Sequence, residues 1–132
     1  AALVASLSAC AAPSSVGVSG RREGRGAILG PTTVATCEHV VAGHSAAQVI
    51  HKGRSYPARV VAWLSGGRER VAILEVSGID LGDGLEPAPD GSRPVLGMRV
   101  DYGDSGSPVL DADGRLVGIL SGVCVLPVRG VR

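Results

Sequence analysis

The chain has 132 residues, a length typical of one domain, and its formal net charge of +1 gives no electrostatic argument for a nucleic-acid partner. Hydrophobic residues make up 45% but aromatic residues only 2%, with no Phe, so a core must be built from Val, Leu, Ile and Ala. The 20 Gly and 8 Pro lie among short runs rich in β-branched residues, which predicts an all-β barrel or sandwich.

The N-terminal segment consists mainly of small residues. Residues 1–9 are apolar, too short for a membrane-spanning helix, and typical of the end of a signal peptide. Leu7-Ser8-Ala9-Cys10 resembles a bacterial lipobox, in which Cys10 becomes lipid-modified and anchors the protein to a membrane. The alternative is an ordinary signal peptide with an incidental cysteine. We expect a flexible tether over residues 10–19, a folded domain over residues 20–132, and a location in the bacterial cell envelope or outside the cell.

Two short strands are predicted on either side of the Gly30-Pro31 turn. The second leads directly into Thr36-Cys37-Glu38-His39-Val40-Val41, so His39 follows a strand. An imidazole titrates near neutral pH and can both accept and release a proton, which makes His39 a candidate acid–base residue. The sequence has no Cys-x-x-Cys or His-x-x-x-His pair, so we expect no metal and no other cofactor.

Further strands are predicted along the middle of the chain. Residues 48–64 indicate a hairpin that turns at Lys52-Gly53, and Arg70–Val76 is an apolar strand. Residues 79–90 are polar and rich in Gly and Pro, which is typical of a connection between two β-structures.

The most informative stretch is GDSGSPVLDADGRLVGILSG, residues 103–122. Ser105 lies between glycines in a sharp turn, and a hairpin follows whose Asp113-Gly114 pair predicts a tight turn with positive φ at both residues. Glycines beside a serine leave room for backbone N–H groups to converge on an oxygen that becomes negative during acyl transfer. Gly103 and Ser105 can supply two such donors, so Ser105 is a candidate nucleophile.

These segments resemble the landmarks of the chymotrypsin and trypsin clan of serine proteases. The run GDSGSP resembles the clan's pattern Gly-Asp-Ser-Gly-Gly/Ser-Pro, and TCEHVV resembles its segment Thr-Ala-Ala-His-Val-Val, in the same His-before-Ser order. The resemblance covers about residues 25–122 and implies a chymotrypsin-like double β-barrel. It also implies an endopeptidase that cleaves protein or peptide substrates, with His39 as general base for Ser105 and an oxyanion hole at Gly103 and Ser105.

The third landmark, an aspartate before a hydrophobic strand, is matched only in part, because Arg70 stands in the place of the aspartate. Loss of that carboxylate lowers turnover about 10⁴-fold in the Ser-His-Asp triad. A cation beside the imidazole would lower turnover further, because it disfavours formation of the imidazolium. Glu69 can serve as third member if a bulge or turn redirects it. Glu38, another carboxylate or a Ser-His dyad are alternatives. A second function is also open, that of a catalytically impaired protease-like domain that binds peptides or envelope proteins.

Residues 79–102 leave room for only one or two strands before the serine motif, and one is predicted at 94–100. We therefore expect the second barrel to be abbreviated.

The resemblance also implies substrate-binding residues. Arg99 is expected at the floor of the specificity pocket, where it would favour an acidic residue before the scissile bond, and Ser121 and Gly122 beside the substrate backbone. Cys37 and Cys124 are expected as buried thiols, or as a disulfide in an oxidising compartment.

Overall fold

The computed structural model describes residues 15–19, 23–41, 44–65, 69–94, 105–121 and 124–128. Within these residues the structure is all-β apart from α2 (Glu38–Val41), a helix of four residues. The described residues contain no helix with the length and apolar composition needed to cross a bilayer. The strands are β1 (Ser15–Ser19), β2 (Glu23–Ile28), β3 (Thr33–Cys37), β4 (Ala46–His51), β5 (Arg54–Ser65), β6 (Arg70–Val76), β7 (Pro108–Leu110), β8 (Leu116–Ser121) and β9 (Cys124–Pro127).

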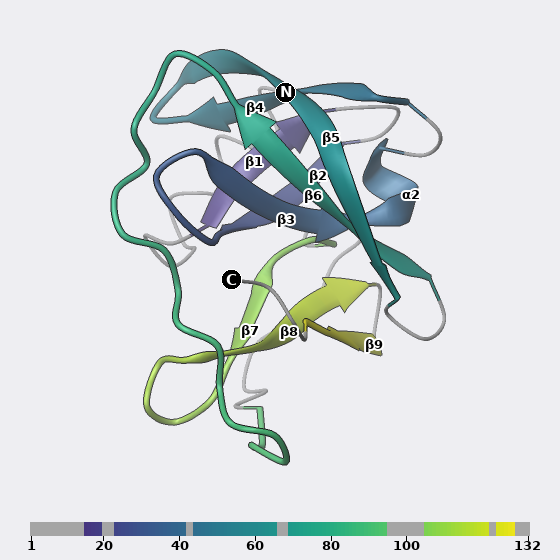
Figure 1. Ribbon diagram of the computed structural model, residues 1–132, viewed down its shortest axis with the longest axis vertical. Helices are drawn as coiled ribbons and strands as arrows, with labels where there is room; N and C mark the ends of the chain where they lie inside the picture. Colours follow the sequence, from purple (N-terminus) through teal and green to yellow (C-terminus); the bar gives the residue numbers. More distant parts are fainter. Residues whose placement is uncertain are drawn as a thin grey trace.

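Six strands form a closed barrel in the order β1-β2-β3-β6-β5-β4, with every neighbouring pair antiparallel. Its interior is filled by aliphatic side chains, and those with no exposed surface include Val18, Val34, Val49, Val71 and Leu74. β-Branched side chains suit strands, so a core rich in valine is compatible with the absence of Phe. Figure 1 shows the barrel in the upper part of the molecule and a smaller sheet beneath it.

Strand β1 corrects the domain boundary predicted from the sequence. The sequence predicts a tether up to residue 19, but Ser15–Ser19 pairs with both β2 and β4 and completes the barrel. Val16 and Val18 are 1% and 0% exposed. They alternate with smaller residues, as a strand requires, but the surrounding Ser, Ala and Gly are also typical of linkers, which hides the signal. Residues 1–14, including Cys10, lie outside the described residues.

Both predicted hairpins are present, but one differs in its turn. In the β4–β5 hairpin Lys52 and Gly53 have φ values of 50° and 78°, as in a primed two-residue turn. In the β7–β8 hairpin Gly114 has a φ of 79° whereas Asp113 does not adopt a positive φ. The side chain of Asp111 accepts hydrogen bonds from two backbone N–H groups of this loop, which stabilises a longer turn than the expected one.

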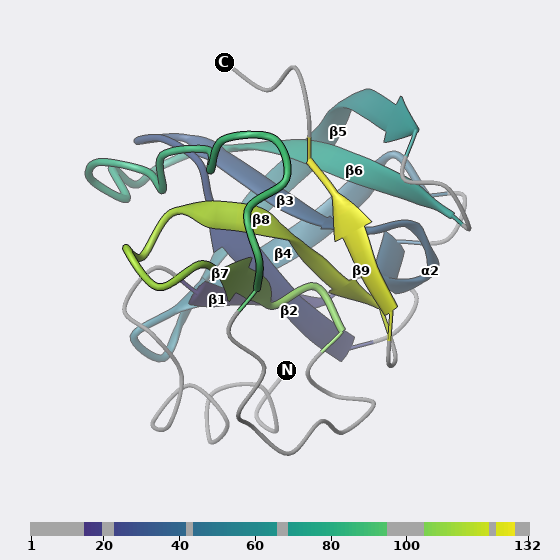
Figure 2. The ribbon, with the colours of Figure 1, turned by 90° about the horizontal axis from the view of Figure 1, so that it is seen from below.

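The second sheet has three strands in the described part of the chain, in the order β7-β8-β9. Residues 77–94 run from β6 to this sheet without regular structure and hydrogen-bond to both layers, for example Leu85 N to Ile28 O (2.9 Å) and Leu116 N to Glu86 O (2.7 Å). Figure 2 shows β8 crossing beneath the barrel, with β7 and β9 on either side. A closed six-stranded barrel with a second small sheet confirms the expected abbreviated arrangement. Most of the strand predicted at 94–100 lies outside the described residues.

The turn that begins at Ser105 is held between the two sheets. Arg25 N in β2 donates to Ser105 O (2.7 Å), Gly106 N donates to Leu120 O (2.7 Å), and Leu120 N donates to Ser107 O (2.9 Å). Gly106 has a φ of 97°, and a Cβ at this position would lie 1.7 Å from the carbonyl oxygen of Arg25. Glycine is therefore required here both for the backbone conformation and for the close approach to β2.

We expect Gly106→Ala to lower the free energy of unfolding by about 3 kcal/mol or more, because the added methyl group would strain φ and clash with the Arg25 carbonyl. Gly114→Ala is the matched control, since Gly114 also has a positive φ but has no atom within 4 Å of the added Cβ. It should cost only about 1 kcal/mol. Urea denaturation measures both, and equal losses would contradict the tight docking of the turn against β2.

Candidate active site

His39 lies in α2, the short helix that directly follows β3. Val40 and Val41 are fully buried and anchor this helix on the barrel. The imidazole remains 38% exposed. The predicted histidine thus stands at the end of a strand with a fixed backbone and an accessible ring.

Glu69 reaches the imidazole of His39. In the antiparallel β3–β6 pair Cys37 lies opposite Val71, which brings the start of β6 beside the end of β3. Glu69 occupies a bend just before β6, so its side chain does not follow the alternation of the strand. Its Oε2 accepts a hydrogen bond from His39 N (3.0 Å), and its Oε1 and Oε2 lie 3.0 and 3.2 Å from Nδ1. A carboxylate only accepts, so this contact requires the hydrogen on Nδ1 and leaves Nε2 as the acceptor of a neutral ring.

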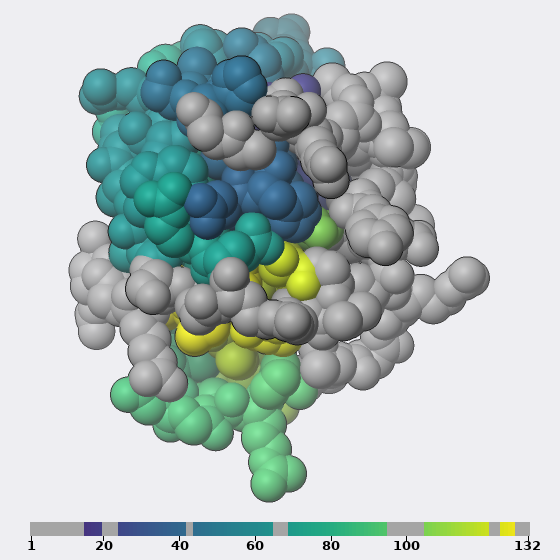
Figure 3. All heavy atoms as spheres, turned by 90° about the vertical axis from the view of Figure 1, so that its right-hand side faces the viewer, coloured from purple at the N-terminus to yellow at the C-terminus, as the bar shows by residue number. Residues whose placement is uncertain are grey.

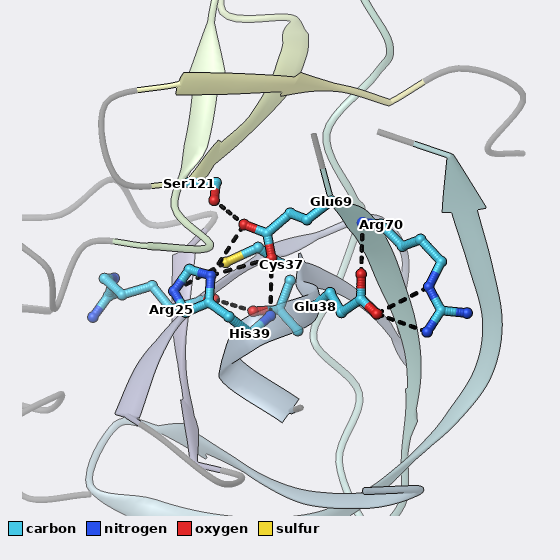
Figure 4. Close-up of polar contacts among 8 residues, drawn as sticks. Arg25, Cys37, Glu38, His39, Glu69, Arg70 and Ser121 are labelled. Carbon is cyan, nitrogen blue, oxygen red and sulfur yellow. Dashed lines mark hydrogen bonds and ion pairs between the residues drawn. The ribbon is translucent and has the colours of Figure 1, made fainter. Parts of the chain in front are cut away.

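Ser121, the last residue of β8, donates its hydroxyl hydrogen to Glu69 Oε1 (Figure 4). Burial raises the pKa of the Glu69 carboxyl, but the hydrogen bonds from Ser121 and His39 outweigh burial and bring the pKa below its ordinary value. Glu69 is therefore ionised at neutral pH. The sequence predicts Ser121 only as a substrate-binding residue, and no local pattern predicts its contact with a carboxylate 52 positions away.

Arg70 points away from the imidazole, on the other side of Glu38 (Figure 4). Its Nε and Nη2 donate to Glu38 Oε2 at 3.0 and 2.7 Å, and its backbone N donates to Glu38 Oε1 at 2.9 Å. The hydrogen bonds from Arg70 lower the pKa of the Glu38 carboxyl. Of the two carboxylates considered from the sequence, Glu69 contacts the histidine ring and Glu38 binds the arginine.

Cys37 is a buried free thiol at the end of β3. Its Sγ lies 3.9 Å from His39 Nε2. Burial, together with the charge of Glu69, raises the pKa of this thiol to about 12, so it is protonated and not nucleophilic at neutral pH. Potential metal-ligand atoms of Cys37, His39 and Glu69 lie within 4.8 Å of one another, but hydrogen bonds within the group already use them. The side chain of Cys124 lies outside the described residues.

The serine turn approaches the barrel beside α2. A Cβ placed on Gly24 in β2 would lie 2.8 Å from Ser105 O and 2.6 Å from Cγ2 of Val40, the residue after His39. The backbone of Ser105 and the helix that carries His39 therefore flank the same point of β2. Ser105 is 1% exposed. Figure 3 shows the side of the molecule that carries α2, where blue atoms of the barrel meet green and yellow atoms of the second sheet.

Four predicted site residues, Cys10, Arg99, Gly103 and Gly122, lie outside the described residues. The lipid attachment, the pocket floor and one of the two oxyanion donors therefore remain predictions. The described residues bring His39, Glu69 and Ser121 into contact, with the Ser105 turn next to the helix. The ionised carboxylate of Glu69 lies on Nδ1 of His39, and Nε2 is left able to accept a proton. This arrangement is suited to general base chemistry.

No protein-family model and no curated protein matches the chain. Solved structures of several proteases are similar to it. A serine-to-alanine variant of Rv3671c from M. tuberculosis, in an inactive form, superposes with a TM-score of 0.71 at 22% identity, over 91% of this chain and 83% of that chain. For the active form of the Rv3671c protease the TM-score is 0.67 at 24% identity, over 96% and 82%.

A serine protease of a human pathogenic astrovirus has a TM-score of 0.68 at 16% identity, over 91% of this chain and 93% of that chain. The serine endoprotease of Yersinia pestis has a TM-score of 0.62 at 19% identity, over 89% of this chain and 59% of that chain. At these identities the likeness is one of fold. The chain has a chymotrypsin-like fold with a closed first barrel and an abbreviated second one.

Proposed function

We propose that the protein is a serine endopeptidase that hydrolyses peptide bonds through an acyl-enzyme at Ser105. In this proposal His39 is the general base, and Glu69 is the third member of the catalytic triad. The observation that carries this proposal is the Glu69 carboxylate on His39 Nδ1. A carboxylate at that nitrogen holds the tautomer in which Nε2 can accept a proton, and it stabilises the imidazolium that forms. The proteases of similar fold support the same reaction class.

In this mechanism Ser105 Oγ attacks the carbonyl carbon of the scissile bond while His39 Nε2 takes the hydroxyl proton. The imidazolium then gives that proton to the leaving amine, and the C–N bond breaks to leave an acyl-enzyme. A water molecule repeats the same steps and releases the acid. We assign the oxyanion hole to the backbone N–H groups of Gly103 and Ser105.

The substrate contacts are proposed from the sequence. Arg99 would select an acidic side chain before the scissile bond, and Ser121 and Gly122 would lie along the substrate backbone. The lipid anchor at Cys10 and a location in the cell envelope are likewise proposals from the N-terminal motif.

A second candidate function is a protease-like domain that binds peptides or envelope proteins without cleaving them. Two observations favour it. Ser105 is 1% exposed, and the thiol of Cys37 lies 3.9 Å from Nε2, the nitrogen that a general base needs. Covalent labelling of the serine distinguishes the two functions.

We expect a fluorophosphonate probe to modify the wild-type protein at Ser105, because a base-activated serine attacks phosphorus as it attacks a carbonyl. Ser105→Ala should abolish labelling and His39→Ala should slow it at least about a hundredfold. Ser77→Ala, at an exposed serine after β6, is the control and should be labelled normally. Mass spectrometry of the labelled peptide identifies the site. A folded wild-type protein that is not labelled would contradict the peptidase proposal in favour of the binding domain.

Glu69→Gln should slow labelling on the order of 10⁴-fold, the loss seen when a neutral amide replaces the carboxylate of the Ser-His-Asp scheme. Ser121→Ala should slow it only about tenfold, because it removes one hydrogen bond to a charged group. The second-order labelling rate constant measures both. A Glu69→Gln rate equal to that of the wild type would indicate a Ser-His dyad instead of a triad.

The lowered pKa of Glu69 also predicts how stability depends on pH. A carboxyl with a pKa below its ordinary value of 4.5 contributes stability that is fully present above that value and is lost as the pH falls through the lowered pKa. The difference in free energy of unfolding between wild type and Glu69→Gln should therefore be largest above pH 4.5 and shrink below it. Urea denaturation across this range measures the difference, and one that grows toward acid pH would contradict the ionised assignment.

A further inference from the structure

The start of α2 and the start of β6 are joined by a reciprocal pair of side-chain bonds. Glu69 accepts the backbone N–H of His39 (3.0 Å), and Glu38 accepts the backbone N–H of Arg70 (2.9 Å). Glu69 thus binds the residue after Glu38, and Glu38 binds the residue after Glu69. We call the four residues Glu38, His39, Glu69 and Arg70 the reciprocal clamp.

The clamp begins where the backbone ladder ends. The register of β3 and β6 runs from Thr33–Glu75 to Cys37–Val71 and stops there. Beyond it, backbone N–H groups need other acceptors, and two carboxylates provide them. The bond to Arg70 N fixes the peptide plane between Glu69 and Arg70, so it also restrains the direction in which the Glu69 side chain leaves the backbone.

The guanidinium of Arg70 holds Glu38 in place for this task. Its Nε and Nη2 bind Glu38 Oε2 at 3.0 and 2.7 Å, and its Cζ lies 4.2 Å from the ring centroid of Trp63 in β5. The side chains of Arg70 and Glu38 are 52% and 30% exposed, so the ion pair itself contributes little to global stability. Its effect is geometric, because a planar donor on an aromatic face orients the carboxylate that it binds.

From this geometry we propose that Glu38 and Arg70 are positioning residues that keep the Glu69 carboxylate on His39 Nδ1. The inference rests on the proposed peptidase function, in which that contact is catalytic. It also gives a role to the arginine that stands where the sequence pattern has an aspartate. The carboxylate lies one position earlier, and the arginine restrains it through Glu38.

The test compares two variants. Glu38→Ala removes all three hydrogen bonds between Glu38 and Arg70. Arg70→Met removes the guanidinium but keeps the backbone N–H that donates to Glu38. Arg70→Lys is the conservative variant. Arg59→Met is the matched control, because Arg59 forms an exposed ion pair with Glu75 (3.3 Å) that also reaches β6 but lies away from the site. Two quantities are measured: the rate of fluorophosphonate labelling, and the NMR resonance of the His39 Nδ1 proton.

We expect labelling to slow about fivefold in Arg70→Met, because Glu38 then keeps only its hydrogen bond to the backbone N–H of residue 70. Glu38→Ala should slow it about tenfold or more, because a backbone donor also loses its acceptor. Arg70→Lys should fall between Arg70→Met and the wild type, and Arg59→Met should match the wild type. The resonance of the His39 Nδ1 proton should be downfield and sharp in the wild type and in Arg59→Met. In Glu38→Ala and Arg70→Met it should be broadened by exchange with water.

The clamp proposal would be overturned if Glu38→Ala is labelled at the same rate as the wild type and shows an unchanged Nδ1 proton resonance. It would also be overturned if the wild type shows no downfield resonance. If the wild type shows the resonance but is not labelled, the peptidase proposal fails, and broadening in the variants still supports the clamp. Thermal unfolding of each variant separates positioning from loss of fold. Should Glu38→Ala fail to fold, Arg70→Lys and Arg70→Met decide by the same two measurements.

Discussion

The hydrogen bond between the Glu69 carboxylate and His39 Nδ1 is the interaction on which the rest of the site depends. It needs a charged carboxylate in a partly buried place, which burial alone would disfavour. Three donors from two elements offset that cost: the backbone N–H and the ring N–H of His39 in α2, and the hydroxyl of Ser121 at the end of β8. The histidine, its carboxylate and the second sheet are thereby fixed as one unit.

The barrel supplies the rigidity that this contact requires. β3 and β6 are neighbours inside a closed sheet, so the ends that carry His39 and Glu69 have no free edge along which to slip. The core inside the barrel is aliphatic and well buried, and the buried side chains of Val40 and Val41 anchor α2 on it. A small domain without Phe can therefore hold a polar site, because the register of its strands, rather than large aromatic side chains, sets the geometry.

Much of this architecture follows from local sequence patterns. The strands from β2 to β6 and the β7–β8 hairpin are predicted because apolar residues alternate or run between Gly- and Pro-containing turns. The positions of His39 after a strand and Ser105 in a glycine-rich turn are predicted for the same reason. β1 is missed, because Ser-Val-Gly-Val-Ser has a composition equally typical of a linker.

The contacts within the site could not be predicted in the same way. Counting back from the apolar run places Arg70 at the aspartate position, whereas the direction of Glu69 is set by a bend and by bonds to a segment 30 residues earlier. The extra methylene group of glutamate lengthens the reach of a carboxylate that starts one residue earlier. The Ser121 bond joins segments of different sheets and depends on how the two sheets pack, which no local pattern encodes.

The buried side chain of Arg25 links the N-terminal strand to the serine. Its Nε donates to Ser15 Oγ in β1 (2.7 Å), while its backbone N donates to the carbonyl oxygen of Ser105 (2.7 Å). Gly106 lies directly against the backbone of Arg25, so the turn packs on β2 with no room for a side chain between them. A mechanical load applied at Ser15 would thus reach Ser105 through two hydrogen bonds and the single residue Arg25.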